Sequence, residues 1–163
     1  MTMLIQRVNI LCSTVLHISI DRLNYIIANI EKFYIEYQKP KRDKNGAKRL
    51  NKPQYQERYG KYWSRTINPP HEELKNIQKC INGYLVNNIP MPDFAYGGVK
   101  EKDNILNAKQ HKGRKYVFQT DLTDFYPFIS CKSVYEMFVR VGFSADVASK
   151  LTKLTTFKGH LPQ

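Results

Sequence analysis

The segment FQTDLTDFYP, residues 118–127, places two carboxylates three residues apart, directly before two adjacent aromatic side chains and a proline. It overlaps the run KGRKYVFQTDL, residues 112–122, whose composition predicts a β-strand. A strand that ends at Asp121 would hold this carboxylate rigidly, and the backbone carbonyl of Leu122 would lie beside it. Because Mg²⁺ prefers oxygen ligands, these two groups are candidate metal ligands.

The same ten residues also have a purely structural interpretation. The two acids would lie near the N-terminus of a short helix, where the helix dipole favours negative charge, and the aromatic rings would pack into the core. The Asp-x-x-Asp spacing is frequent, so the segment alone favours this second interpretation. The surrounding sequence therefore has to decide between the two.

The chain is strongly basic, with 26 Lys and Arg against 14 Asp and Glu over 163 residues, a formal net charge of +12. Its hydrophobic content of 42% excludes a disordered tail and suits one domain or part of a larger one. Clustered cations favour a polyanionic partner, nucleic acid first, because phosphate binding releases counterions. Alternatively, the charge only keeps the protein soluble.

The cysteines and the N-terminal residues indicate the cellular compartment in which the protein is expected. The cysteines are odd in number, widely spaced and without metal-ligand intervals: Cys12, Cys80 and Cys131. This pattern predicts buried, reduced thiols in a cytoplasmic protein. The apolar residues 1–16 are interrupted by polar side chains and lack the features of a signal peptide. We therefore expect a soluble protein with no membrane partner.

Periodicity predicts both helices and strands. Helices with apolar stripes or serine caps are expected at 20–33, 71–85, 104–108, 130–141 and 144–155. Two β-prone stretches, 33–42 and 62–70, flank the turn signal Asp43-Lys44-Asn45-Gly46. The basic, tyrosine-rich stretch 47–61 is expected to be a solvated loop, or else a surface that binds nucleic acid. Without strict βαβ alternation, the predicted class is α+β.

Four blocks in order resemble bacterial reverse transcriptases, especially the retron and defence-associated branch. Residues 121–129, Asp-Leu-Thr-Asp-Phe-Tyr-Pro-Phe-Ile, resemble the first catalytic motif of that family. The other blocks are Arg65-x-Ile67-x-x-Pro70 with Leu74-Lys75-x-Ile77-Gln78, then Gly98-Val99 with Asn104-Ile105-x-Asn107-Ala108-x-x-His111, and finally Leu161-Pro162-Gln163. The resemblance extends over residues 16–163.

The resemblance implies the fingers and part of the palm of a right-hand polymerase. Residues 1–110 would form an N-terminal helical segment and the fingers, and residues 111–163 the first part of the palm, truncated inside the second palm motif. The whole enzyme would be an RNA-directed DNA polymerase that uses two Mg²⁺ ions. Its partners would be an RNA template, a primer and deoxynucleoside triphosphates.

By the same resemblance, the quoted segment supplies the catalytic centre. Asp121 would be the catalytic magnesium ligand, with the backbone carbonyl of Leu122 as a second ligand. Tyr126 would exclude a 2′-hydroxyl from the incoming sugar. Asp124 and Phe125 would line the nucleotide pocket.

The fingers and the last block supply the remaining nucleotide contacts. Arg65 would clamp the triphosphate, a role for which the guanidinium fork is suited. Lys41 would be its lysine partner, with Lys48 or Lys61 as alternatives because the stretch up to Arg65 is longer than the family's tight hairpin. Gln163 would contact the nascent base pair.

Two further departures from the family leave alternative functions open for this chain. Phe128 replaces a small residue, and no Tyr-x-Asp-Asp motif, which supplies the family's other magnesium carboxylates, occurs in the sequence. We therefore expect this chain alone to bind RNA without polymerising and, with a strand edge exposed, to self-associate. The alternatives are an RNA-binding relative without chemistry and an unrelated basic RNA-binding protein. Retron DNA synthesis, phage defence and intron mobility all stay open as roles.

Overall fold

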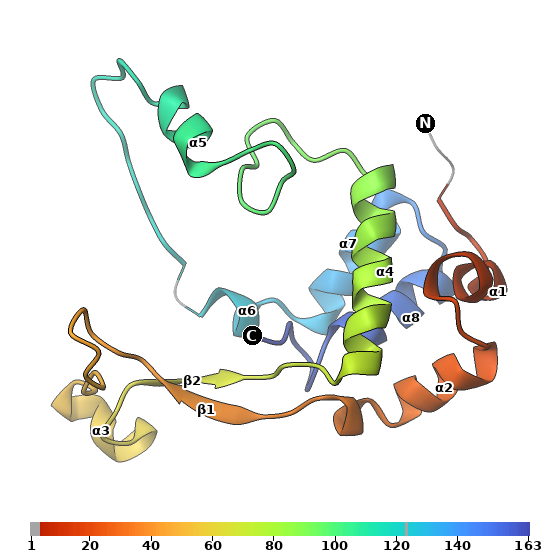
Figure 1. Cartoon of the computed structure of the whole chain (residues 1–163), viewed down its shortest axis with the longest axis horizontal. Coiled ribbons are helices and arrows are strands. Elements are labelled where there is room, and N and C mark those ends of the chain that lie inside the picture. The colour runs from red at the N-terminus through yellow and green to blue at the C-terminus, as the bar shows by residue number, and fades with distance from the viewer. Residues whose placement is uncertain (1–3, 123) are drawn as a thin grey trace.

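The computed structural model describes residues 4–122 and 124–163, so Thr123 of the quoted segment lies outside the described residues. The chain forms a helical body, a β-hairpin that extends from it, and a long connecting segment between α4 and α6 that contains the short helix α5 (Figure 1). The elements are α1 (Val8–Ile10), the π-helix η1 (Leu11–Leu16), α2 (Ile20–Ala28), the 3-10 helix η2 (Ile30–Phe33), β1 (Tyr37–Pro40), α3 (Pro53–Tyr59), β2 (Ser64–Ile67), α4 (Glu72–Asn88), α5 (Asn104–Gln110), α6 (Phe125–Phe128), α7 (Cys131–Val141) and α8 (Ala145–Thr155). This mixture agrees with the predicted α+β class.

Helix α8 lies at the centre of the helical body and packs against α1, α2, α4 and α7. One side of it is buried, through Val147, Ala148, Leu151 and Leu154. The apolar stripes predicted for residues 20–33 and 71–85 also enter this core, with Leu23, Ile26, Leu74, Ile77 and Ile81 all buried. The hydrophobic effect therefore holds the body together around α8.

Serine caps set the starts of three helices as the sequence predicts. The hydroxyls of Ser19, Ser130 and Ser144 accept hydrogen bonds from backbone N–H groups in the first turns of α2, α7 and α8. Each such cap contributes about 1 kcal/mol. Helix α7 ends at Gly142, whose φ of 111° is accessible to glycine at little cost.

The hairpin is longer and more elaborate than its sequence suggests. Strands β1 and β2 pair antiparallel, with Lys39 opposite Arg65, and the predicted turn closes through Gly46 N–H and the Asp43 carbonyl at 3.1 Å. Beyond the strands, the backbone of Arg49 is hydrogen-bonded to the segments on both sides. Its N–H donates to the Lys41 carbonyl (2.8 Å), and its carbonyl accepts from the Trp63 N–H (2.9 Å). Residues 47–61, expected to be a loop, contain α3, which starts at a proline suited to the first helical turn.

The strand predicted for residues 112–122 is wrong. This segment is extended but carries no strand pairing, and Tyr116 and Phe118 are 82% and 90% exposed. A strand forms only where a neighbour satisfies its backbone N–H and C=O groups, and no described segment pairs with this one. The expectation of self-association rests on an exposed strand edge, and residues 112–122 do not form such a strand.

The three cysteines are free thiols, as predicted, but they are not all buried. Cys12 lies in the core, where burial raises the pKa of its thiol, whereas Cys131 is exposed at the start of α7. The expectation of buried thiols is therefore wrong for Cys131.

No single helix within residues 4–122 and 124–163 is both long and apolar enough to cross a membrane. Residues Val8–Leu16 and Ile20–Ala28 reach that length and composition only as a pair, and the pair is bent by 95°. Leu11 and Leu23, one from each half, are buried in the core.

Candidate nucleotide-binding site

The quoted segment turns sharply between its two acids. Asp121 and Leu122 are exposed at the end of the extended stretch. Asp124 adopts φ 52° and ψ 38°, a left-handed conformation in which Asp is one of the more tolerated non-glycine residues, and the chain then enters α6. The Asp124 side chain makes no capping hydrogen bond to α6. Neither acid is therefore committed to stabilising a helix end.

The aromatic side chains of α6 lie outside the core. The rings of Phe125 and Tyr126 pack edge to face, 5.6 Å apart at 81°, and remain 47% and 46% exposed. Phe128 is 79% exposed. The structural interpretation, with these rings in the core, is therefore wrong for this structure, and the rings are free to contact a ligand.

The last residues of the chain connect this motif to the hairpin. The Leu161 N–H donates to the Ile129 carbonyl just after α6 (3.0 Å), and the Asn68 N–H donates to the Gln163 carbonyl just after β2 (2.7 Å). Figure 1 shows the C-terminus between α6 and β2. Gln163 and the quoted segment are thus held on the side of the molecule from which the hairpin extends.

An ion pair strengthens this connection. The Lys158 Nζ lies 3.0 Å from both carboxylate oxygens of Glu36, which also accepts a hydrogen bond from the buried Asn68 side chain at 3.2 Å. The hydrogen bond from Lys158 lowers the pKa of the Glu36 carboxyl. Glu36 therefore joins the base of the hairpin to the C-terminal residues.

The hairpin register identifies a lysine that the sequence did not single out. Residues directly opposite in an antiparallel pair share one face, so Lys39 and Arg65 project to the same side. Lys41 lies one step further along this face, opposite Trp63, to which it is hydrogen-bonded through the backbone at 2.7 Å. Its ammonium sits 3.8 Å from the centre of the Trp63 ring. Lys39 is thus the lysine opposite Arg65; only the register, absent from the sequence pattern, reveals this.

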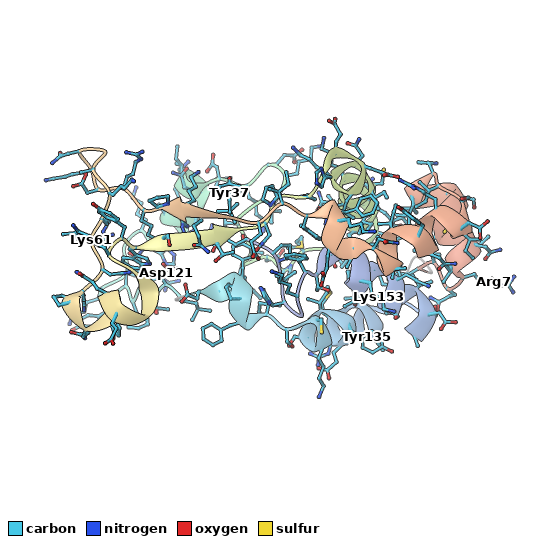
Figure 2. The ribbon with its side chains drawn as sticks, turned by 90° about the horizontal axis from the view of Figure 1, so that it is seen from below. Arg7, Tyr37, Lys61, Asp121, Tyr135 and Lys153 are labelled. Carbon is cyan, nitrogen blue, oxygen red and sulfur yellow. The ribbon has the colours of Figure 1, made fainter. Side chains whose placement is uncertain are left out.

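The two alternative lysines lie nearer the tip of the hairpin. Lys48 and Lys61 place their ammonium groups 5.4 Å and 5.8 Å from the centre of the Tyr62 ring. These contacts are of the cation–π type. Figure 2 shows Lys61 and Asp121 toward the hairpin end of the molecule, with Tyr135 and Lys153 toward the helical end.

Two neighbouring residues of the motif carry the oxygen donors that the sequence predicts as magnesium ligands. The Asp121 carboxylate and the Leu122 carbonyl are hard oxygen donors, and Mg²⁺ is commonly held by one or two carboxylates together with water and substrate phosphates. Within residues 4–122 and 124–163, no group of three His, Cys, Asp or Glu side chains could hold a metal ion. The donors present therefore fit as one contribution to such a site.

Comparison with known proteins identifies the relatives of the chain. It is 32% identical over 152 residues to the retron Se72 reverse transcriptase of Salmonella heidelberg, a match that covers 93% of the chain and 36% of that protein. It is 31% identical over 99 residues to the retron Ec86 reverse transcriptase of Escherichia coli, covering 61% of the chain and 31% of that protein. The chain is homologous to retron reverse transcriptases. No protein-family model matches it.

The homology confirms the resemblance to the retron branch of bacterial reverse transcriptases. A third relative, the retron Mx65 reverse transcriptase of Myxococcus xanthus, is 30% identical over 92 residues and is covered over 22% of its length. The chain spans about a third of the length of the first two retron reverse transcriptases.

Proposed function

We propose that the chain forms the fingers and the first part of the palm of a retron-type reverse transcriptase. Residues 1–110 are the N-terminal helical segment and fingers, and residues 111–163 begin the palm. In the complete enzyme this segment takes part in RNA-directed DNA synthesis on a primed RNA template, with deoxynucleoside triphosphates as substrates. The homology to retron reverse transcriptases supports this assignment.

Asp121 is the catalytic residue contributed by this segment. Its carboxylate and the Leu122 carbonyl would hold Mg²⁺, which neutralises triphosphate charge and lowers the pKa of the attacking hydroxyl. Tyr126 lines the sugar pocket and excludes a 2′-hydroxyl, while Asp124 and Phe125 complete its wall. The exposure of both Asp121 and the Tyr126 ring supports these roles, because a ligand has access to them.

Arg65 clamps the triphosphate from the hairpin. Lys39 or Lys41, which share its face of the hairpin, supplies the second positive charge, and Gln163 contacts the nascent base pair. The observation that carries the proposal is that backbone hydrogen bonds connect the quoted segment to the hairpin. One bond joins Leu161 to Ile129, and the other joins Asn68 to Gln163. Together they link three of the four blocks that resemble the family.

The test is primer extension by the intact protein that carries this chain. Asp121→Ala should abolish synthesis and leave thermal unfolding unchanged, because Asp121 is exposed and makes no side-chain hydrogen bond or ion pair within residues 4–122 and 124–163. Asp146→Ala, which removes another exposed carboxylate, from the first turn of α8, is the matched control and should retain synthesis. Near-normal synthesis by the Asp121 variant would remove Asp121 from the catalytic centre.

A second function, RNA binding without chemistry, is favoured for the 163-residue chain by itself. Two magnesium ions that bridge a primer hydroxyl and a triphosphate need more carboxylates than Asp121 supplies. The net charge of +12 includes a dense run between Lys39 and Lys61, which favours RNA binding that weakens steeply with salt. Incubating the chain with primed RNA, magnesium and labelled deoxynucleotides tests this: extension above that of Asp121→Ala would contradict it.

A further inference from the structure

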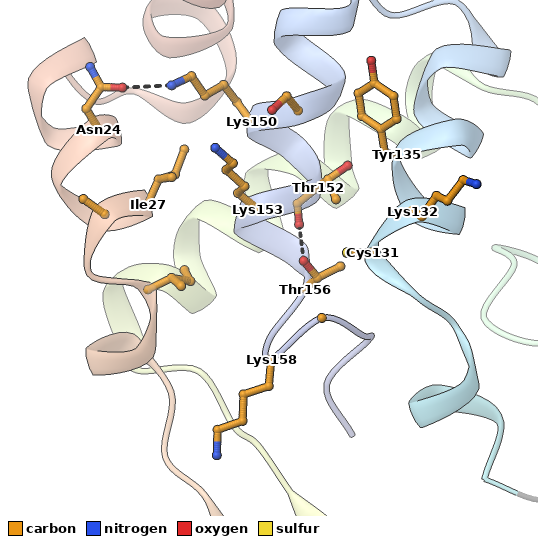
Figure 3. A pocket seen from close by; sticks show the side chains of 14 residues that line it. Asn24, Ile27, Cys131, Lys132, Tyr135, Lys150, Thr152, Lys153, Thr156 and Lys158 are labelled. Atoms are coloured by element: carbon orange, nitrogen blue, oxygen red, sulfur yellow. Dashed lines mark hydrogen bonds between the residues drawn. The ribbon is translucent and has the colours of Figure 1, made fainter.

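A groove of about 750 Å³ lies on the helical body, between α2, α7 and α8. Four of the fourteen described residues that line it are lysines, and none is an acid: Lys132, Lys150, Lys153 and Lys158. The groove also has an apolar lining, to which Ile27, Ala28 and Tyr135 contribute. Figure 3 shows Lys150 and Lys153 on α8, with Lys132 and Tyr135 across from them on α7.

The positive charge of the groove is only partly balanced. Lys158 is paired with Glu36, and Lys132 lies 3.8 Å from the exposed carboxylate of Glu136. Lys150 donates to the neutral Asn24 side chain at 3.0 Å. Lys153 has no hydrogen bond or ion pair to the residues that the structure describes. Two lysines one turn apart on α8 thus face the same groove without a carboxylate partner, which costs electrostatic free energy unless an anion binds.

The lysines follow the direction of α8, which suits a linear polyanion. Lys150 and Lys153 are separated by about 4.5 Å along the helix axis, whereas Lys158, beyond the end of α8, is already paired with Glu36. Tyr135, partly buried against the core, lines the opposite wall and provides an aromatic surface for an unpaired base, a contribution typical of single-strand binding. An acidic peptide would satisfy the lysines but would make no comparable use of this ring.

We infer that the groove between α2, α7 and α8 binds the phosphodiester backbone of a single nucleic-acid strand. It is a second contact surface on the helical body, separate from the hairpin and from Asp121. The inference does not depend on the proposed catalytic role, because none of the residues that line the groove belongs to the quoted segment.

The test is the salt dependence of binding by the purified protein, measured by fluorescence anisotropy with labelled oligouridylate over a range of KCl concentrations. The double variant Lys150→Ala, Lys153→Ala removes two phosphate contacts, so the slope of log affinity against log salt should fall by about 1.4. The matched control, Lys75→Ala with Lys79→Ala, removes two exposed lysines from α4, outside the groove, and should change the slope far less. Equal changes in the two double variants would overturn the inference.

Further measurements check the fold of the variants and the chemistry of the ligand. Circular dichroism should show the same helix content in both double variants, because alanine favours helix. The salt slope of the Lys150, Lys153 double variant and primer extension by Asp121→Ala are independent readouts, so failure of the catalytic proposal is distinguishable from failure of this one. Labelled polyglutamate should bind without dependence on Lys150 and Lys153; binding that is as tight as that of oligouridylate, and equally dependent on them, would assign the groove to an acidic protein instead.

Discussion

The side chain of Gln78 joins three parts of the structure at the base of the hairpin. Its Nε2 donates to the Tyr34 hydroxyl and to the Leu154 carbonyl, each at 2.8 Å. Tyr34 is 6% exposed, and its ring lies 4.6 Å from that of Phe157. Burial raises the pKa of the Tyr34 hydroxyl, which therefore stays neutral at physiological pH. The Leu154 carbonyl belongs to the last turn of α8, where helices leave acceptors without an internal partner.

Replacing Gln78 by leucine keeps the approximate volume of the side chain and removes both hydrogen bonds. Each bond contributes a net 0.5–1.5 kcal/mol, so Gln78→Leu should lower the free energy of unfolding by about 2 kcal/mol. For a chain of this size, that corresponds to a fall in Tm of about 4 to 8 °C. Urea unfolding followed by circular dichroism measures the change directly.

A double-mutant cycle separates the two bonds. Tyr34→Phe removes only the hydroxyl and should cost about 1 kcal/mol in the unaltered chain, but far less when Gln78 is already leucine. Costs that simply add in the double variant would show that the two side chains are not coupled. An unchanged unfolding free energy in Gln78→Leu would refute the assignment of Gln78 as the link between α4, α8 and the hairpin.

Three further outcomes are expected. Tyr126→Ala in the intact protein should raise ribonucleotide incorporation, measured by primer extension, and an unchanged sugar preference with retained activity would assign the ring to packing alone. Leu151→Ala, at a residue 1% exposed in α8, should cost about 3 kcal/mol in urea unfolding, and a cost below about 1 kcal/mol would contradict its central place. Arg22 donates two hydrogen bonds to Glu73 (2.7 and 2.6 Å), which lower the pKa of that carboxyl. The stabilisation is therefore present above the ordinary glutamate pKa of 4.5 and lost as pH falls below it. The stabilisation by the Arg22–Glu73 pair should be small, because both side chains are substantially exposed. Glu73→Gln should remove this pH dependence of Tm.

Much of the helical body was predictable because its signals are local. A serine hydroxyl caps a helix within one turn. The apolar stripes of α2, α4 and α8 are likewise recognised from residues that lie one turn apart. The starts at Ser19, Ser130 and Ser144 and the stop at Gly142 could therefore be placed from neighbouring residues alone.

The incorrect predictions depend on partners that are distant in sequence. Residues 112–122 have the composition of a strand, but a strand also needs a neighbour, and composition carries no information about one. The pairing of Lys39 with Arg65 is a matter of register, which sequence spacing from the motif does not give. The exposure of Cys131 follows from the position of α7 on the surface. For the candidate site, the sequence nominated residues, but their connection through Gln163 and Asn68 became visible only in the structure.

The central position of α8 has a consequence for how the chain folds during synthesis. Helices α1, α2 and α4 leave the ribosome before α8, so the hydrophobic core that includes Leu23 and Leu74 remains incomplete until residues 145–155 arrive. The bond from Gln78 to Leu154 spans 76 residues of sequence and the Glu36–Lys158 pair spans 122, and contacts this distant form late because loop closure has to precede them. The nascent chain should therefore pass through a stage with an exposed apolar surface that chaperones recognise, which ends when α8 docks.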